Sequence, residues 1–368
     1  MTRARALLLA AGLCAAPEVL AGQAATTLAR TGATFESYSF GTGLAFKKIS
    51  EFTIPMVVTQ RVGSRLVLDV GTAFVSASAT LSNDTTIDYS GLVDTDIRAT
   101  IAVVPGKLLL NIVGTIPTGA RTVPDTTIPL FGATATDLLG FTTPSFGAGG
   151  AMSAGFASAF KLGSNWAIGA GASYRYGGSY QPVSSNPAEL TPGGEIRARL
   201  GIEGPFGGNK YFRGALVLTT TAANDITGGD QSTIGTRVLA YVATSQPLGS
   251  SNLSIYGWDM RRLRPDSSRY PVPRGNVLAL GARLERPLSP KATLAPMLEF
   301  RHELTGPTSH MELLGYLVRT GADLRYRLSN HATGVVQAQL AFGSLHSEAG
   351  ESVSLIGPRL GTLIEWSR

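Results

Sequence analysis

The sequence predicts an all-β fold, namely a transmembrane antiparallel up-and-down β-barrel of about 16 strands, with 14 strands as the near alternative. Three observations predict it: charged and apolar residues alternate one for one in many segments, very short connections alternate with longer ones, and an export signal opens the chain. No later apolar stretch reaches the 18 residues that a membrane helix needs. An exported chain of 368 residues is then either soluble or a barrel.

Residues 1–21 have the features of a secretory signal peptide. Arg3 and Arg5 precede an apolar run over 6–16, and a Val-x-Ala pattern ends at Ala21, with Ala24 as the second choice for the cleavage site. Residues 22–33 are expected to form a short periplasmic segment, and 34–368 the barrel. The single cysteine, Cys14, lies in the signal, so the mature chain is expected to have no disulfide.

The stretch "EIRARLGIE" over 195–203 shows the alternation most clearly. At a strand period of two, the charged residues share one face and the apolar residues share the other. A soluble sheet would have to hide the apolar face of every such strand in a core. A closed barrel instead turns the charged face to a lumen and the apolar face to lipid, and it also pairs every strand edge.

The strands follow from this alternation and from the turn residues between its segments. They are expected at 34–46, 51–61, 65–79, 94–104, 108–116, 147–161, 166–176, 194–203, 211–221, 233–245, 252–262, 275–286, 292–304, 313–328, 332–345 and 353–366. The short connections lie at 62–64, 105–107, 163–165, 205–210, 248–251, 289–291 and 329–331. The longer connections lie at 82–91, 117–145, 177–193, 222–231, 263–274, 305–311 and 346–352. Short connections are typical of the periplasmic side, and an even strand number puts both termini there.

Inward-facing charges are expected along several of these strands. The predicted lumen-lining residues are Glu195, Arg197, Arg199, Asp259, Arg261, Arg283, Glu299, Arg301, Glu303, Arg319, Asp323 and Arg325. Two interpretations are open: the charges filter solutes in a polar conduit, or facing arginines and acids pair to support the wall.

The longest connection, 117–145, is unusually apolar for a solvated loop. Its large apolar residues are Ile128, Leu130, Phe131, Leu138, Leu139 and Phe141. The segment is expected either to fold inward as a constriction, to contact a hydrophobic ligand, or to cap the barrel by packing on neighbouring loops.

Other chemistry is not expected. The four histidines form no spaced pair, so neither a metal site nor a cofactor is predicted. Ser309 and His310 are adjacent in a loop, which is not the geometry of a catalytic triad, so no enzyme is predicted. With 31 basic and 25 acidic residues and no basic run, the chain shows no nucleic-acid patch.

The Gly-rich, Tyr-bearing alternation and the "PTG" at 117–119, straight after a strand, resemble the outer-membrane transporter families for long-chain fatty acids and aromatic hydrocarbons. They also resemble the barrel family attached to phenol degradation. The resemblance implies a transport barrel. The fatty-acid transporters carry an N-terminal plug and an Asn-Pro-Ala motif near the mature start, whereas the "NPA" here, at 186–188, lies in a loop and takes no role.

We therefore expect a bacterial outer-membrane channel or transporter for passive passage of small molecules, leaning to hydrophobic ones because of the apolar loop. A general or solute-specific porin is the first alternative, and a structural or surface-interaction barrel with a blocked lumen is the second. Expected partners are outer-membrane lipids, small-molecule solutes and, during biogenesis, the barrel assembly machinery. The last strand, "RLGTLIEWSR", resembles the signal that this machinery reads, with Leu360, Ile364 and Trp366 facing lipid.

Overall fold

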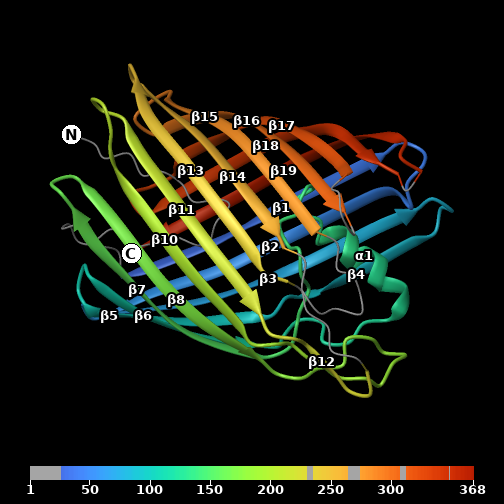
Figure 1. Cartoon of the computed structure of the whole chain (residues 1–368). Coiled ribbons are helices and arrows are strands. Elements are labelled where there is room, and N and C mark those ends of the chain that lie inside the picture. The colour runs from blue at the N-terminus through green and yellow to red at the C-terminus, as the bar shows by residue number, and fades with distance from the viewer. Residues whose placement is uncertain (1–25, 230–234, 264–273, 307–311, 348) are drawn as a thin grey trace.

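The computed structural model describes residues 26–229, 235–263, 274–306, 312–347 and 349–368. They form a closed antiparallel β-barrel with 16 wall strands (Figure 1). Each strand pairs with its sequence neighbours, and β1 pairs with β19 to close the wall. The expected fold class and strand number are confirmed.

The barrel strands in chain order are β1 Thr27–Phe40, β2 Phe46–Val62, β3 Leu66–Leu81, β4 Thr86–Leu92, β5 Thr95–Val104, β6 Leu108–Ile116, β7 Ala151–Leu162, β8 Trp166–Gly177, β10 Glu195–Pro205, β11 Tyr211–Thr221, β13 Arg237–Leu248, β14 Ser251–Arg262, β15 Arg274–Pro287, β16 Ala292–Gly306, β17 Glu312–Arg327, β18 Ala332–His346 and β19 Ser352–Ser367. Outside the wall, β9 Leu190–Thr191 pairs with β12 Asp225–Ile226. The long connection holds a 3₁₀ turn, η1 Asp125–Thr127, and one helix, α1 Ile128–Thr134.

Strands β4 and β5 share one place in the wall. β5 pairs with the first half of β3, and β4 pairs with the second half, with a break at Val93 and Asp94. β4 lies in what the sequence predicted as a loop, 82–91. It forms because β3 continues to Leu81 and offers its edge to a returning chain.

The chain enters the wall earlier than expected. β1 begins at Thr27, so residues 27–33 belong to the barrel, where Arg30 lies opposite Glu365 of β19 and their side chains are 3.0 Å apart. The expected signal peptide lies outside the described residues. No helix in the described part of the chain is long and apolar enough to cross a membrane.

The two ends of the barrel differ, as the connection lengths predicted. At the turn end, five short connections carry a glycine with positive φ: Gly63 at 64°, Gly106 at 72°, Gly163 at 64°, Gly208 at 68° and Gly249 at 59°. Only glycine adopts this backbone conformation without a Cβ penalty, so these positions fix tight hairpins. The opposite end, here called the loop end, carries α1 and the small β9–β12 sheet (Figure 1).

The outer face of the wall is a belt of exposed apolar side chains. Along β10 and β11, Ile196, Leu200, Leu216 and Leu218 all point outward, and Leu200 is 58% exposed. Trp366, Ile364 and Leu360 continue the belt on β19, as predicted. Exposed apolar surface on this scale is stable in lipid and not in water.

Near the loop end of β3 and β4, the inward and outward faces exchange character. Val75, Ala77 and Ala79 are inward and buried, whereas Ser76 and Ser78 lie on the outward face. The inward face can be apolar here because protein, not water, fills this part of the lumen. That filling comes from the connection between β6 and β7.

Candidate channel lumen and its inward loop

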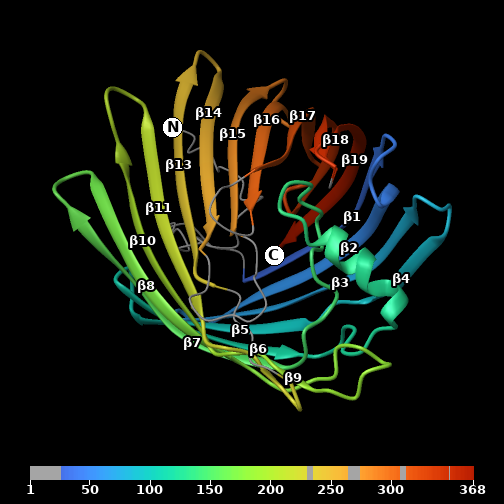
Figure 2. The same cartoon turned by 45° about the vertical axis from the view of Figure 1, so that its right-hand side comes forward.

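The connection between β6 and β7 enters the barrel instead of projecting from it (Figure 2). After η1 and α1, residues 135–146, here called the inward segment, lie in the lumen. They contact strands from both ends of the chain: β1, β2 and β3 on one side, and β16, β17 and β19 on the other. Of the three expectations for this loop, the structure matches the one in which it folds inward.

The neck of the loop is closed by Asp94, at the break between β4 and β5. Its Oδ1 accepts a hydrogen bond from the Gly119 amide at 3.0 Å, and its Oδ2 accepts one from the Ala148 amide at 2.8 Å. Any Cβ at Gly119 would collide with the Phe146 carbonyl. One carboxylate thus joins the outgoing and returning chains.

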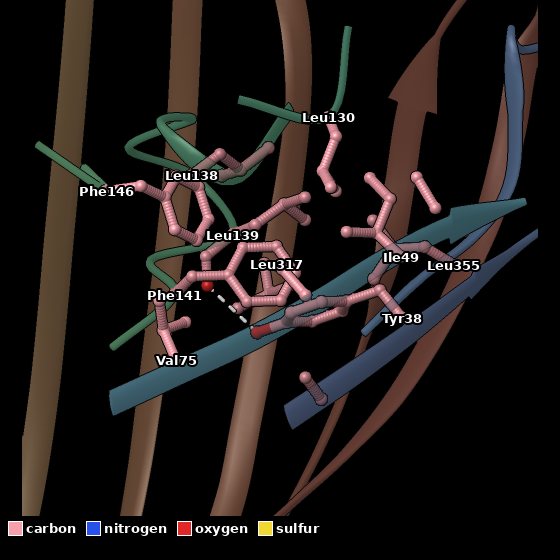
Figure 3. Packing of buried hydrophobic residues seen from close by; sticks show 13 residues of the cluster. Tyr38, Ile49, Val75, Leu130, Leu138, Leu139, Phe141, Phe146, Leu317 and Leu355 are labelled. Atoms are coloured by element: carbon pink, nitrogen blue, oxygen red, sulfur yellow. Dashed lines mark hydrogen bonds between the residues drawn. The ribbon is translucent and has the colours of Figure 1, made fainter. Parts of the chain in front are cut away.

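Most of the loop's large apolar side chains are buried and pack against one another and the wall inside the barrel. Leu130 and Leu138 are fully buried, and Leu139 and Phe141 nearly so. Figure 3 shows these residues together with Tyr38, whose ring meets that of Phe141 edge-on at 5.2 Å.

The other two apolar residues of the predicted set lie nearer the surface. Phe131 stacks on Phe146, with ring centroids 4.5 Å apart. Ile128, at the start of α1, is 45% exposed.

Two buried glutamates hold the inward segment against β1 and β2. Glu36 Oε2 accepts from the amide and the hydroxyl of Thr142, at 2.7 and 2.8 Å. Glu51 Oε1 accepts from the Thr143 amide at 2.8 Å. Arg359 of β19 completes the contact, 3.0 Å from Glu36. A carboxylate accepting backbone amides fixes the chain direction as well as its position.

Two arginines hold the same segment from the opposite side. Arg319 Nη2 donates to the Leu139 carbonyl at 2.9 Å and to the Tyr38 hydroxyl at 2.8 Å. Arg301 Nη1 donates to the Asp137 carbonyl at 3.2 Å. Both guanidinium groups lie beside Glu299, at 3.7 and 2.8 Å. The carbonyls of the loop thus replace water around two buried cations.

Asp137 links the inward segment to strand β14. Its carboxylate lies 3.7 Å from the Arg262 guanidinium. Burial raises the pKa of the Asp137 carboxyl above its ordinary value, and Arg262, Arg237 and Arg301 oppose that rise. The position of Asp137 therefore places the segment next to a group of arginines on the wall.

The strand registers place ten of the twelve predicted lumen-lining residues on the inward face. They are Glu195, Arg197, Arg199, Arg283, Glu299, Arg301, Glu303, Arg319, Asp323 and Arg325. Several pair with one another, as in Arg283 to Asp323 at 2.6 Å and Arg197 to Glu195 at 3.3 Å. Wall-supporting ion pairs and a charged lumen therefore coexist.

Asp259 and Arg261 were predicted to line the lumen, and this was wrong. They share the outward face of β14 with Ile255, while Trp258, Met260 and Arg262 point inward. Arg261 lies 2.9 Å from Asp259, and Asn276 of β15 donates to Asp259 at 2.6 Å. The pair lies near the loop end of its strand, where a charge costs far less than at the middle of the belt.

Sequence reasoning missed the residues that hold the loop: Glu36, Glu51, Asp94 and Arg359. Alternation could have identified Glu36 and Arg359 as inward-facing charges, because they occupy inward positions of β1 and β19. Nothing local marks Asp94, because its role depends on a contact with residues 119 and 148. The described residues contain no group of three or more His, Cys, Asp or Glu side chains that could hold a metal ion.

No family model and no curated protein matches this chain. Among solved structures, a loop-deletion form of OmpT, an outer membrane protein of Vibrio cholerae, is similar, with 13% identity and a TM-score of 0.46 over 93% of this chain and 100% of that chain. An outer membrane channel from Pseudomonas putida F1 is similar at 12% identity, with a TM-score of 0.42 over 95% and 98%. A bacterial polysaccharide outer membrane secretin is similar at 9% identity, with a TM-score of 0.49 over 92% and 98%.

Likeness at this level concerns the fold alone. The closed wall and its apolar belt define the class, a β-barrel of the bacterial outer membrane. The resemblance noted in the sequence is confirmed at that level. For the fatty-acid, aromatic-hydrocarbon and phenol-degradation families it stays a prediction.

Proposed function

We propose that the protein is a passive outer-membrane channel for small polar solutes, with the inward segment as its constriction. One observation carries the proposal: the inward segment covers the arginines of one side of the lumen and leaves those of the other side accessible. The side chains of Arg301 and Arg319 are 11% and 4% exposed, whereas those of Arg197 and Arg237 are 34% and 39% exposed. A charged, solvated wall suits polar solutes.

The apolar loop was the reason to expect hydrophobic solutes, and the structure weakens that reason. Burying a large apolar side chain is worth roughly 1.5–3 kcal/mol, and that gain can be realised on a ligand or within the protein. Leu130, Leu138, Leu139 and Phe141 realise it within the protein. Of the six apolar loop residues, Ile128 alone is exposed enough to meet a ligand from outside.

A second candidate, passage of hydrophobic molecules, is favoured by the wall itself. Among the described residues, the only strand registered with β4 is β3. The next strands along the wall do not continue beside β4, because β6 ends at Ile116 and β7 begins at Ala151. The loop packs against the inward face of β4, where the ring of Tyr89 lies 5.2 Å from the ring of Phe131. If the loop moved, an apolar molecule could enter there from the lipid.

Single-channel conductance of the refolded protein in a planar bilayer tests the proposal. The wild type is expected to conduct, and a variant lacking 124–142 is expected to assemble and conduct more. Absence of conductance from both, with the barrel folded by its heat-modified gel mobility, would favour a blocked structural barrel.

The same deletion separates the two candidates. Vesicles carrying each protein are assayed for swelling in a small neutral sugar and for uptake of an aromatic hydrocarbon. A polar channel gains sugar permeability on deletion and leaves hydrocarbon uptake unchanged. A large change in hydrocarbon uptake alone would replace the polar proposal with the hydrophobic one.

A further inference from the structure

The accessible side of the lumen carries an excess of positive charge. On β8, β10, β11, β13 and β14, the inward wall positions hold six arginines and two glutamates. They are Arg175, Arg197, Arg199, Arg213, Arg237 and Arg262, with Glu195 and Glu203. Counting Asp137 of the inward segment as a third acid still leaves three positive charges in excess.

The acids present do not neutralise this surface. Glu195 is shared by Arg197 at 3.3 Å and Arg237 at 3.6 Å. Glu203 lies 3.0 Å from Arg213. Because these side chains are about a third exposed or more, their guanidinium groups keep donors directed to water.

The covered side of the lumen is different. Glu299 lies between Arg301 and Arg319, and Glu36 faces Arg359. Carbonyls of the inward segment accept further hydrogen bonds from Arg301 and Arg319. Each of these cations is paired with an acid and is largely buried. The excess of positive charge is therefore a property of the wall from β8 to β14 and not of the covered side.

The same wall leaves room for a solute. Below the arginines, the inward positions of β8 and β10 include Gly169, Gly171 and Gly201. A Cβ placed at any of them would meet only atoms of the adjoining strand, and none from across the lumen. A passage along β8 and β10 would thus run beside small residues and beneath a row of cations.

We propose that this wall selects small anions, such as carboxylates or phosphates, and disfavours cations of similar size. The proposal rests on the proposed channel function and names its solute class. The physical reason is that arginines lining a pore raise the local concentration of anions and repel cations.

The reversal potential of the protein in a planar bilayer under a potassium chloride gradient tests the inference. Wild-type channels are expected to pass chloride several-fold better than potassium. The double variant Arg197→Gln/Arg237→Gln should lose most of that preference. Glu195→Gln, which removes the shared acid, should strengthen it, and so gives a shift of opposite sign if the double variant fails to fold.

Arg261→Gln is the matched control. It removes one arginine charge from a strand of the same wall, but on the outward face, so the chloride preference should not change. Conductance without anion preference, or an equal shift from Arg261→Gln, would overturn the inference and leave the channel function standing. Complete absence of conductance would overturn the channel function itself.

Discussion

Leu200 and Ala215 lie on adjacent strands and face opposite media. Leu200 points outward into the apolar belt, and Ala215 points into the lumen beside Gly201. An arginine at the first position must leave its charge in lipid, whereas at the second it reaches water. Strand parity alone therefore separates the two substitutions.

Leu200→Arg is expected to destabilise the barrel by about 2–4 kcal/mol, the cost of an arginine near the bilayer midplane. Ala215→Arg is expected to cost much less. Unfolding titrations in lipid vesicles measure both. Similar losses for the two variants would contradict the two-faced wall.

At the same scale, Asp259 and Arg261 show where sequence reasoning fails. Alternation separates charged from apolar positions, but it does not say which side each set faces near a strand end. The inward positions of β14 are Trp258 and Met260 flanked by Arg262, so the apolar set is inside. The Trp258 ring lies under the Arg301 guanidinium, with its centroid 5.7 Å from the guanidinium carbon. That cation–π contact depends on another strand and cannot be seen locally.

At the scale of elements, the inward segment is held by groups that the sequence does not place together. Its apolar character left an inward fold, a ligand contact and a cap open as alternatives, and in the structure it folds inward. Its attachment points could not be predicted, because the Leu139 carbonyl meets an arginine 180 residues away and the Thr142 amide meets a glutamate 106 residues away. Such contacts follow from the closure of the barrel and from no local pattern.

Arg319→Met should loosen the inward segment while leaving the wall intact. The variant removes the charged donor that the Leu139 carbonyl and the Tyr38 hydroxyl share, and a hydrogen bond to a charged group is worth about 1.5–3 kcal/mol. The Tyr38 hydroxyl remains as the second donor to the Leu139 carbonyl. Glu299 keeps Arg301 as its partner. The expected result is a larger and noisier single-channel conductance.

Arg325→Met is the control for this prediction. Arg325 lies on the same strand and on the same inward face, towards the turn end and opposite Thr293 of β16. It should leave the conductance noise at the wild-type level. Equal noise in both variants would mean that Arg319 does not hold the loop.

At the scale of the whole molecule, the two ends of the barrel predict its orientation. Short hairpins gather at one end, and the β9–β12 sheet and α1 at the other. In outer-membrane barrels the short turns face the periplasm. The loop end should therefore face outward from the cell.

Epitope tags test this orientation. A tag after Asn186 is expected to be labelled on intact cells, and a tag after Pro290 only after the outer membrane is permeabilised. Both positions are exposed connections, so neither tag should disturb the wall. Labelling of the second tag on intact cells would reverse the orientation.

The inward segment also bears on the order in which the barrel is made. It touches the first strands through Glu36 and Glu51 and the last ones through Arg319 and Arg359, and so it spans the β1–β19 seam from within. A segment with contacts on both margins of an unclosed sheet lowers the free energy of bringing those margins together. The β1–β19 pairing should consequently form late in folding, after the inward segment has packed against the strands on both sides. Removal of 124–142 should then slow the closure of the barrel more than it destabilises the closed wall.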